Sequence, residues 1–186
     1  MCLIPAKSLR DENVLNGIPE NPGHYKWWAP KAALETILPG DFLGQIFPRL
    51  TMRRILIGDE SHDYYYVYAG TASNVRQRLG WHVNRINRLS AIRSGALSTL
   101  RQTLSSIAAH DQSDTGATNE LIDQMYIEYY VDGVLQYAQD WEKGEIRDNV
   151  LPLNIQHQRH RLLVGYKKWL SQRRGESKQK GIARLS

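Results

Sequence analysis

Aromatic and β-branched residues gather in three short runs of the chain, at 23–29, 63–70 and 125–131. Such residues suit the pleated, half-buried surface of a sheet, so each run predicts a β-strand. A fourth segment at 52–58 is compatible with a further strand. Glycine at position 70 is expected to end the second of the three main strands.

Apolar residues recur at helical spacing in the segments that separate and follow these runs. Helices are therefore predicted over 31–38, 75–86, 96–107, 134–147 and 155–172. The polar segment 111–119 predicts a loop, residues 173–186 predict a frayed end, and residues 1–22 show little periodicity and predict loops. Strands that alternate with helices in one compact unit indicate a small α/β or α+β domain.

Composition agrees with an ordinary globular domain. The chain has 186 residues, of which 41% are apolar and 23% are charged. No segment approaches the roughly 20 apolar residues that span a bilayer. Cys2 is the only cysteine, which excludes an intramolecular disulfide and is compatible with the cytoplasmic location that we expect. The predicted organisation is a leader over 1–22, a domain over 22–155, and a basic C-terminal helix and tail over 156–186.

Positive charge is concentrated at the C-terminal end of the chain. Residues 156–186 hold nine Lys/Arg and one acid, whereas the whole chain has a net charge of +5. This asymmetry favours a polyanionic partner, with nucleic acid first and an anionic membrane surface second, while the plain alternative is a solvated tail. The membrane alternative depends on one apolar side of the last predicted helix, formed by Leu162, Leu163, Tyr166, Trp169 and Leu170.

Two features after the second main strand could bind phosphate. The turn at 68–74 leads into a helix start, where unpaired backbone N–H groups can hold an anion, although a simple capped connection is the plainer interpretation. Arg78 and His82 lie four residues apart and so share one face of the helix predicted over 75–86. A guanidinium can bind phosphate through two parallel hydrogen bonds, whereas the alternative is a solvated basic face.

A carboxylate and the tyrosines are the remaining chemical candidates. Glu142 falls on the apolar side of the helix predicted over 134–147, where a carboxylate is costly to bury unless it is paired or binds a metal. Mg²⁺ can sit on one or two carboxylates and keep water and phosphate as its other ligands, and the alternative is a boundary residue that reaches water. Tyrosines of the predicted strands should mostly pack, because a phenol with a pKa of about 10 is a poor base unless a cation lowers that value.

Taken in order, these residues resemble the GIY-YIG nuclease family. Gly23-His24-Tyr25 is similar to its first motif and Tyr68-Ala69-Gly70 to its second. The family's arginine, histidine, glutamate and terminal asparagine have counterparts here at Arg78, His82, Glu142 and Asn154. The resemblance covers roughly residues 22–154.

The chain departs from the family pattern in two ways. His24 and Ala69 stand where the two motifs have isoleucine. Tyr25 and Tyr68 are 43 positions apart, which is far more than the family's usual spacing of about ten residues, so the resemblance implies an insertion over about 30–60. Long insertions are tolerated because the entropy of loop closure grows slowly with length.

The resemblance implies a fold and an activity. The expected fold is a small α+β domain with a three-stranded antiparallel sheet flanked by helices, with the insertion between the first two strands. The expected activity is a metal-dependent DNA endonuclease that hydrolyses phosphodiester bonds with Mg²⁺ or Mn²⁺, with DNA as partner and with neither a small-molecule cofactor nor a membrane. The alternative is a catalytically inactive nucleic-acid-binding module that keeps the nuclease fold.

The resemblance also implies a role for each matched residue. Glu142 is expected to hold the metal, Arg78 to stabilise charge on the phosphate, Tyr25 to act as general base, Tyr68 to position it, and His82 to assist. Gly23, Gly70 and Asn154 are expected to support the site. DNA contacts are expected from the basic residues Arg76, Arg85, Arg159, Arg161, Lys167 and Lys168.

Overall fold

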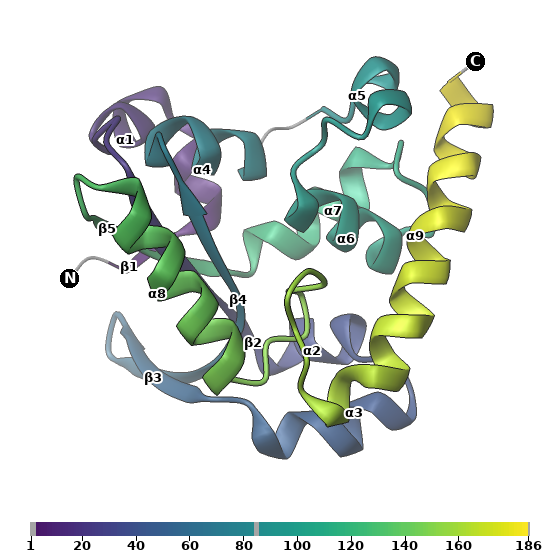
Figure 1. Ribbon diagram of the computed structural model, residues 1–186, viewed down its shortest axis with the longest axis horizontal. Helices are drawn as coiled ribbons and strands as arrows, with labels where there is room; N and C mark the ends of the chain where they lie inside the picture. The colour runs from purple at the N-terminus through teal and green to yellow at the C-terminus, as the bar shows by residue number, and fades with distance from the viewer. Residues whose placement is uncertain (1–2, 84–85, 186) are drawn as a thin grey trace.

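The computed structural model describes residues 3–83 and 86–185 and shows a mixed α/β fold built on one antiparallel sheet (Figure 1). The sheet has five strands in the order β1-β5-β2-β4-β3. Their bounds are β1 (Leu3–Pro5), β2 (Gly23–Pro30), β3 (Met52–Ile57), β4 (Glu60–Ala72) and β5 (Tyr126–Val131). The mixed α/β class is confirmed, whereas the expected three-stranded sheet is wrong.

The two additional strands lie at the edges of the sheet. The strands predicted at 23–29, 63–70 and 125–131 form its centre as β2, β4 and β5. β4 is 13 residues long, and β2 pairs only with its second part, so β3 from the expected insertion pairs with the first part. β1 pairs with β5 over three residues, which is too short for a periodic signal in the sequence.

Helices surround this sheet (Figure 1). Their bounds are α1 (Glu12–Asn16), α2 (Lys31–Ile37), α3 (Asp41–Ile46), α4 (Val75–Val83), α5 (Leu89–Ser94), α6 (Thr99–Ala108), α7 (Thr115–Asp123), α8 (Leu135–Asp148) and α9 (Val164–Leu185), with short 3-10 turns η1 (Ala6–Arg10), η2 (Phe47–Arg49) and η3 (Arg161–Leu163). In the described part of the chain, none of them is both long and apolar enough to cross a membrane.

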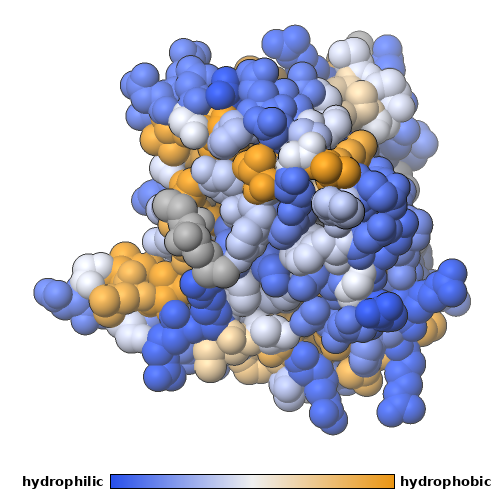
Figure 2. Space-filling view, turned by 60° about the vertical axis from the view of Figure 1, so that its left-hand side comes forward, coloured by the Kyte–Doolittle hydropathy of each residue, from blue (hydrophilic) through white to orange (hydrophobic). Residues whose placement is uncertain are grey.

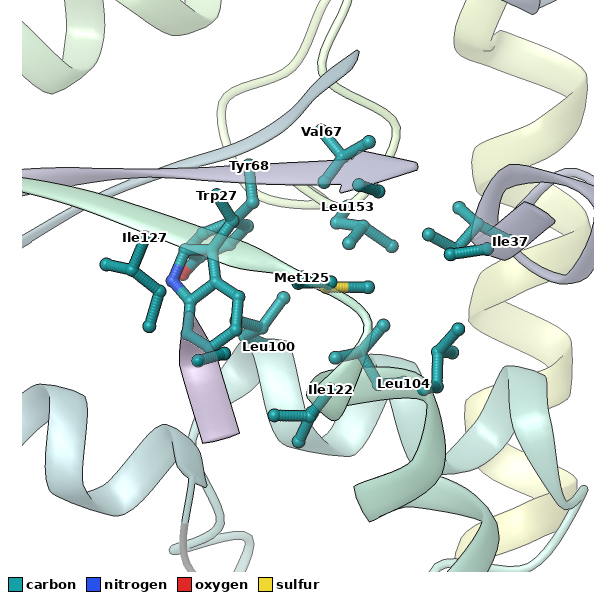
Figure 3. Packing of buried hydrophobic residues seen from close by; sticks show 14 of the residues in the cluster. Trp27, Ile37, Val67, Tyr68, Leu100, Leu104, Ile122, Met125, Ile127 and Leu153 are labelled. Carbon is teal, nitrogen blue, oxygen red and sulfur yellow. The ribbon is translucent and has the colours of Figure 1, made fainter. Parts of the chain in front are cut away.

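Alternation along β2 divides the core between the two faces of the sheet. Tyr25 and Trp27 face the main core, where Trp27 packs among residues of α6, α7 and β5 (Figure 3). Trp28 faces the other way, into a smaller cluster with Tyr66 and with Ile146 of α8. Side chains of successive strand residues point to opposite faces, so the central strand contributes to both clusters.

The N-terminal residues take part in the main core. Loops were expected over 1–22, but residues 3–16 contain β1, η1 and α1, and Ala6, Leu9 and Ile18 are buried. These apolar residues do not recur with one period, because Ala6 and Leu9 lie on a 3-10 turn and Ile18 lies on the connection after α1. The proposed boundaries at 22 and 155 stay predictions.

Two further segments differ from the sequence expectation. α7 occupies part of the expected loop at 111–119, where the Asp114 side chain accepts a hydrogen bond from the Ala117 N–H at 3.1 Å and caps the helix. α9 begins at Val164 instead of 155 and continues to Leu185 through the expected frayed end. Its second half packs through small polar contacts, such as Ser106 with Ser177 at 2.6 Å, which hydrophobic periodicity does not detect.

The apolar side of the last helix is used inside the protein. Leu163, Tyr166 and Leu170 are buried in the main core, and the Tyr166 hydroxyl donates to the carbonyl of Ile37 at 2.7 Å. The amphipathic pattern that suggested a membrane surface is therefore explained by packing against the rest of the chain.

Candidate active site

A tyrosine and a histidine meet at the centre of the site. Tyr25 of β2 is buried, and its hydroxyl lies 2.8 Å from Nε2 of His82 on α4. Nδ1 of His82 lies 2.8 Å from Oγ of Ser98, the residue that caps α6. A strand, the last turn of α4 and the N-cap of α6 thus hold a buried chain of three polar side chains.

Both motif glycines are required by close contacts. A Cβ atom at Gly70 would lie 2.5 Å from Cζ and from the hydroxyl of Tyr25, its partner across β2 and β4. A Cβ atom at Gly23 would lie 2.0 Å from the carbonyl oxygen of Tyr130. Gly70 therefore leaves room for the Tyr25 ring, and Gly23 lets β2 approach β5.

Tyr68, Arg78 and Glu142 lie around the Tyr25–His82 pair. The Tyr68 ring lies 6.4 Å from the ring of Tyr25 and 6.1 Å from that of His82, measured between centroids. Tyr68 and Glu142 line a common hollow of about 100 Å³. The positive charge of Arg78 lowers the pKa of Tyr25, Tyr68 and Glu142, so Arg78 lies within electrostatic range of all three.

The carboxylate of Glu142 and one nitrogen of the Arg78 guanidinium lack hydrogen-bond partners among the described residues. Burial raises the pKa of Glu142 to about 7, while Arg78 and Lys143 act in the opposite direction. Within residues 3–83 and 86–185, Glu142 makes no hydrogen bond or ion pair. The buried Nε of Arg78 also has no hydrogen-bond partner among the described residues. Buried polar groups are normally satisfied, so this pair is available to an external ligand that offers both a cation and an anion.

The same donor set fits a hard cation. Among the described residues, no group of three or more His, Cys, Asp or Glu side chains could hold a metal ion. Among the described residues that line the hollow with Tyr68, Glu142 is the single carboxylate. That arrangement suits Mg²⁺ or Mn²⁺, which can bind through one carboxylate and keep water and phosphate oxygens as further ligands.

Burial sets the protonation of the remaining groups. It raises the pKa of Tyr25 and of Tyr68 well above the ordinary value, so both phenols are protonated at neutral pH. Burial, together with the charges of Arg78 and Arg101, lowers the pKa of His82 to about 3, so its imidazole is neutral. In the tautomer that accepts the Tyr25 proton at Nε2, Nδ1–H donates to Ser98.

The low pKa of His82 predicts that the free energy of unfolding depends on pH in the acid range. Its pKa is about 3 in the folded protein against an ordinary 6.5, so between these values the unfolded chain binds more protons. The free energy of unfolding is therefore expected to fall as the pH drops from about 6.5 towards 3, by up to about 5 kcal/mol. Denaturant unfolding at a series of pH values measures this loss.

The matched variants are His82→Gln and His62→Gln. Glutamine at 82 keeps polar groups near Tyr25 and Ser98 but cannot titrate. The free energy of unfolding of this variant should therefore fall less steeply with decreasing pH than that of the wild type. His62 is exposed on β4, and its replacement should leave the wild-type dependence in place. Equal slopes for His82→Gln and the wild type would contradict the buried neutral imidazole.

Asn154 joins the site to the free edge of β4. Its Oδ1 accepts from the Ala69 N–H and its Nδ2 donates to the Ala69 carbonyl, both at 2.8 Å. The neighbouring Leu153 N–H donates to the carbonyl of Val67 at 3.0 Å. Residues 153–154 therefore take the place of a pairing strand beside Tyr68, where β3 no longer reaches.

The residues expected to contact DNA occupy different environments. Arg159, Arg161 and Lys168 are exposed, while Lys167 donates to the carbonyl of Gln158 at 2.5 Å. Arg76 is engaged within the chain, since it donates to the carbonyl of Ile18 at 2.5 Å and pairs with Glu20 at 2.9 Å. Arg85 lies outside the described residues.

Sequence reasoning missed several groups near the hollow. Thr99 and His157 line it beside Tyr68 and Glu142, and Arg174 of α9 is close enough for its charge to lower the pKa of Tyr68. A serine before an apolar helical run is a capping signal that could have identified Ser98. His157 and Arg174 carry no such signal, because their position depends on how the C-terminal region packs.

The family model of the GIY-YIG catalytic domain matches residues 23–176. No curated protein and no solved structure matches the chain significantly. The family match begins at Gly23 and includes both tyrosines, Arg78, His82, Glu142 and Asn154. The chain therefore belongs to the GIY-YIG catalytic domain family.

Proposed function

We propose that this protein is a metal-dependent endonuclease that hydrolyses phosphodiester bonds in DNA. Membership of the GIY-YIG family supports a nuclease-type function. The observation that carries the proposal is the unpartnered pair formed by the buried Nε of Arg78 and the carboxylate of Glu142, beside two protonated phenols. A phosphodiester with a bound cation supplies the opposite charge for each.

Glu142 is the residue that would hold the cation, Mg²⁺ or Mn²⁺. When bound, a divalent cation stabilises negative charge on the phosphate as a Lewis acid. Arg78 would bind the same phosphate through its guanidinium, which stays charged at any working pH. Preorganised positive charge at the reacting phosphate is commonly the largest contribution to such catalysis.

Tyr25 would act as the general base for the attacking water, with His82 as the residue that positions it. The Tyr25 hydroxyl lies 2.8 Å from Nε2 of the neutral imidazole and donates a hydrogen bond to it, which fixes the orientation of the phenol oxygen. The positive charge of Arg78 lowers the pKa of Tyr25 and so favours its ionised form. Tyr68, which lines the hollow together with Glu142, would position the water.

Cleavage of supercoiled plasmid tests the proposal. The purified protein should nick plasmid with Mg²⁺ or Mn²⁺ and not with EDTA. Arg78→Lys keeps the charge but loses the planar fork, so nicking should fall by about 10²-fold or more, while Arg49→Lys, at an exposed site on η2, should behave as the wild type. Absence of nicking on plasmid, linear and branched DNA with either metal would refute the proposed activity.

The alternative of a binding module without catalysis depends on His24 and Ala69. His24 packs between the rings of Tyr130 and Trp141, at 4.7 and 3.8 Å between centroids, and its Nδ1 lies 2.7 Å from Asp132. Ala69 contacts Asn154, as described above. Neither departure displaces Tyr25 or Tyr68, which favours the catalytic proposal.

Exposed charges near the C-terminal end are expected to contact DNA. Removing α9 would expose the core around Tyr166 and Leu170, so charge replacement is the cleaner change. The combined variant Arg159→Gln, Arg161→Gln and Lys168→Gln should bind DNA more weakly. The slope of log K against log salt should become shallower by up to about 3, because fewer counterions are released.

A matched variant carries the same charge change elsewhere. Lys7→Gln, Lys31→Gln and Arg49→Gln replace three exposed basic residues on η1, α2 and η2. Fluorescence anisotropy with labelled duplex over a salt series measures both variants. An unchanged slope in the C-terminal variant would remove these three residues from the DNA path.

A further inference from the structure

A second pocket is lined by residues of α4, α5 and α6 and of the segments that join them, and it shares Ser98 with the surroundings of His82. Its volume is about 410 Å³, within the usual range for sites that hold small planar ligands or parts of larger ones. Trp81, Ile86 and Leu97 supply apolar surface, and Arg88, Ser98 and Arg101 supply polar groups. The hollow at Glu142 is lined by different residues.

The walls of this pocket are unusual for a protein surface. Trp81 is 49% exposed and Ile86 is 59% exposed, although both are large and apolar. Exposed apolar side chains that gather at a concave site often mark a binding surface. Exposed apolar residues also occur on β3, and Figure 2 shows apolar side chains gathered on a projection at the left of the view.

Polar groups of the pocket are held in place. The Arg101 guanidinium donates to Asn87 at 2.5 Å, to the carbonyl of His82 at 3.3 Å and to Asn119 at 2.8 Å. Arg88 is exposed, so it is accessible to a ligand at the pocket. The pocket thus combines flat apolar walls with a fixed positive charge.

Two contacts link the pocket to the catalytic residues. Ser98 lines the pocket and also contacts His82, the partner of Tyr25. The guanidinium carbon of Arg78 lies 5.2 Å from the centre of the Trp81 ring. A phosphate bound by Arg78 would therefore have Trp81 as its neighbour, within reach of the base of an adjoining nucleotide.

We propose that this pocket binds an unpaired base of the DNA, next to the phosphate that is cleaved. The inference deepens the proposed function, on which it rests, by naming the substrate class: DNA with an unpaired nucleotide at the cleavage point, such as a flap or a gap, in preference to a continuous duplex. A base has apolar faces that stack on an indole and a polar edge that can pair with serine or arginine. The negatively charged phosphates on either side of this base would pair with the positive charges of Arg78 and Arg88.

An unpaired base is a better occupant than a paired one. A base inside a duplex must be unstacked and unpaired before it can enter a pocket, which costs a few kcal/mol, whereas a base in a flap or gap is already free. Base–aromatic stacking is tolerant of sequence, so the pocket would select for structure and not for a particular base.

The test uses DNA that carries the fluorescent base 2-aminopurine. One substrate has 2-aminopurine as the first unpaired nucleotide of a flap, and its control has the same base paired in a continuous duplex. Binding is measured in EDTA, so that no cleavage is needed. The wild type should quench the flap probe and bind it about tenfold or more tightly than the duplex.

Three variants show whether Trp81 is responsible. Trp81→Ala should lose both the quenching and the flap preference while its affinity for the duplex stays at the wild-type value, and Trp81→Phe should retain part of both. Tyr137→Ala is the matched control, because Tyr137 is an exposed aromatic residue on α8 outside this pocket and should change neither. Thermal unfolding establishes that each variant is folded.

The outcomes separate this inference from the proposed function. Equal wild-type affinity for flap and duplex, or equal weakening of both by Trp81→Ala and Trp81→Phe, would overturn the inference. Flap preference that depends on Trp81 supports it even if no nicking is found, in which case only the proposed catalysis fails. Nicking without flap preference would leave the catalysis in place and refute the base pocket.

Discussion

Replacement of Glu142 by glutamine is expected to reduce DNA cleavage by at least about 10³-fold while DNA binding stays near the wild-type level. Glutamine has nearly the same shape, but it carries no charge to hold a divalent cation. Among the described residues that line the hollow with Tyr68, Glu142 is the only acidic one, so the lining offers no second carboxylate in its place. Plasmid nicking with Mg²⁺ and with Mn²⁺ measures the first effect, and fluorescence anisotropy measures the second.

The same variant should not lose stability. Burial raises the pKa of Glu142 to about 7 from an ordinary 4.5, so the folded protein binds this proton more tightly than the unfolded chain. The free energy of unfolding therefore falls as the pH rises from about 4.5 through 7, because the ionised carboxylate is disfavoured in the folded state. Glutamine removes that dependence, and the variant should be at least as stable as the wild type at pH 8.

Asp140→Asn is the matched control for Glu142→Gln. Asp140 lies on the same helix, is exposed, and pairs with Lys143 at 3.1 Å. Its replacement removes one negative charge from α8 without changing the hollow, so nicking should persist. Cleavage by Glu142→Gln close to the wild-type rate would exclude Glu142 as the metal-binding carboxylate.

Replacement of Gly23 by alanine is expected to have the largest effect on stability, a loss of about 3 kcal/mol or more. The added Cβ would lie 2.0 Å from the carbonyl oxygen of Tyr130 and 2.9 Å from a methyl group of Val75. The carbonyl is backbone, and β2 is held between β4 and β5, so neither strand can move without breaking pairing on the other side. Denaturant unfolding measures the loss.

Gly144→Ala is the matched control for Gly23→Ala. Gly144 lies within α8, and no atom lies within 4 Å of the position that its Cβ would take. Alanine favours the helix over glycine by up to about 1 kcal/mol, so this variant should be slightly more stable than the wild type. A wild-type unfolding midpoint for Gly23→Ala would show that β2 and β5 tolerate a wider separation.

Local patterns predicted the elements that carry most of the site. The aromatic runs of β2, β4 and β5 and the helical spacing of α4 and α8 are strong, because these elements bury one face in a large core. The order and spacing of Tyr25, Tyr68, Arg78 and Glu142 then identified the family, which the family match confirms. The roles of these residues stay predictions.

Elements without a periodic apolar face were missed or misplaced. β1 has three residues, and the second half of α9 packs through Ser177 and Gly181. Their formation depends on partners that are distant in the chain, such as β5 for β1 and α6 for α9. Local composition contains no signal for such pairing.

The sequence by itself determined the family, the central strands and the identity of the chemical groups, because hydrophobic periodicity and motif order are local properties. Only the tertiary structure decided which groups meet and how deeply they are buried. Tyr25 and His82 are 57 positions apart and still share a hydrogen bond. Burial then fixes the protonation of both, since desolvation disfavours the charged form of each group. The packing of α4, α5 and α6 also forms the pocket beside Trp81, for which the sequence contains no motif.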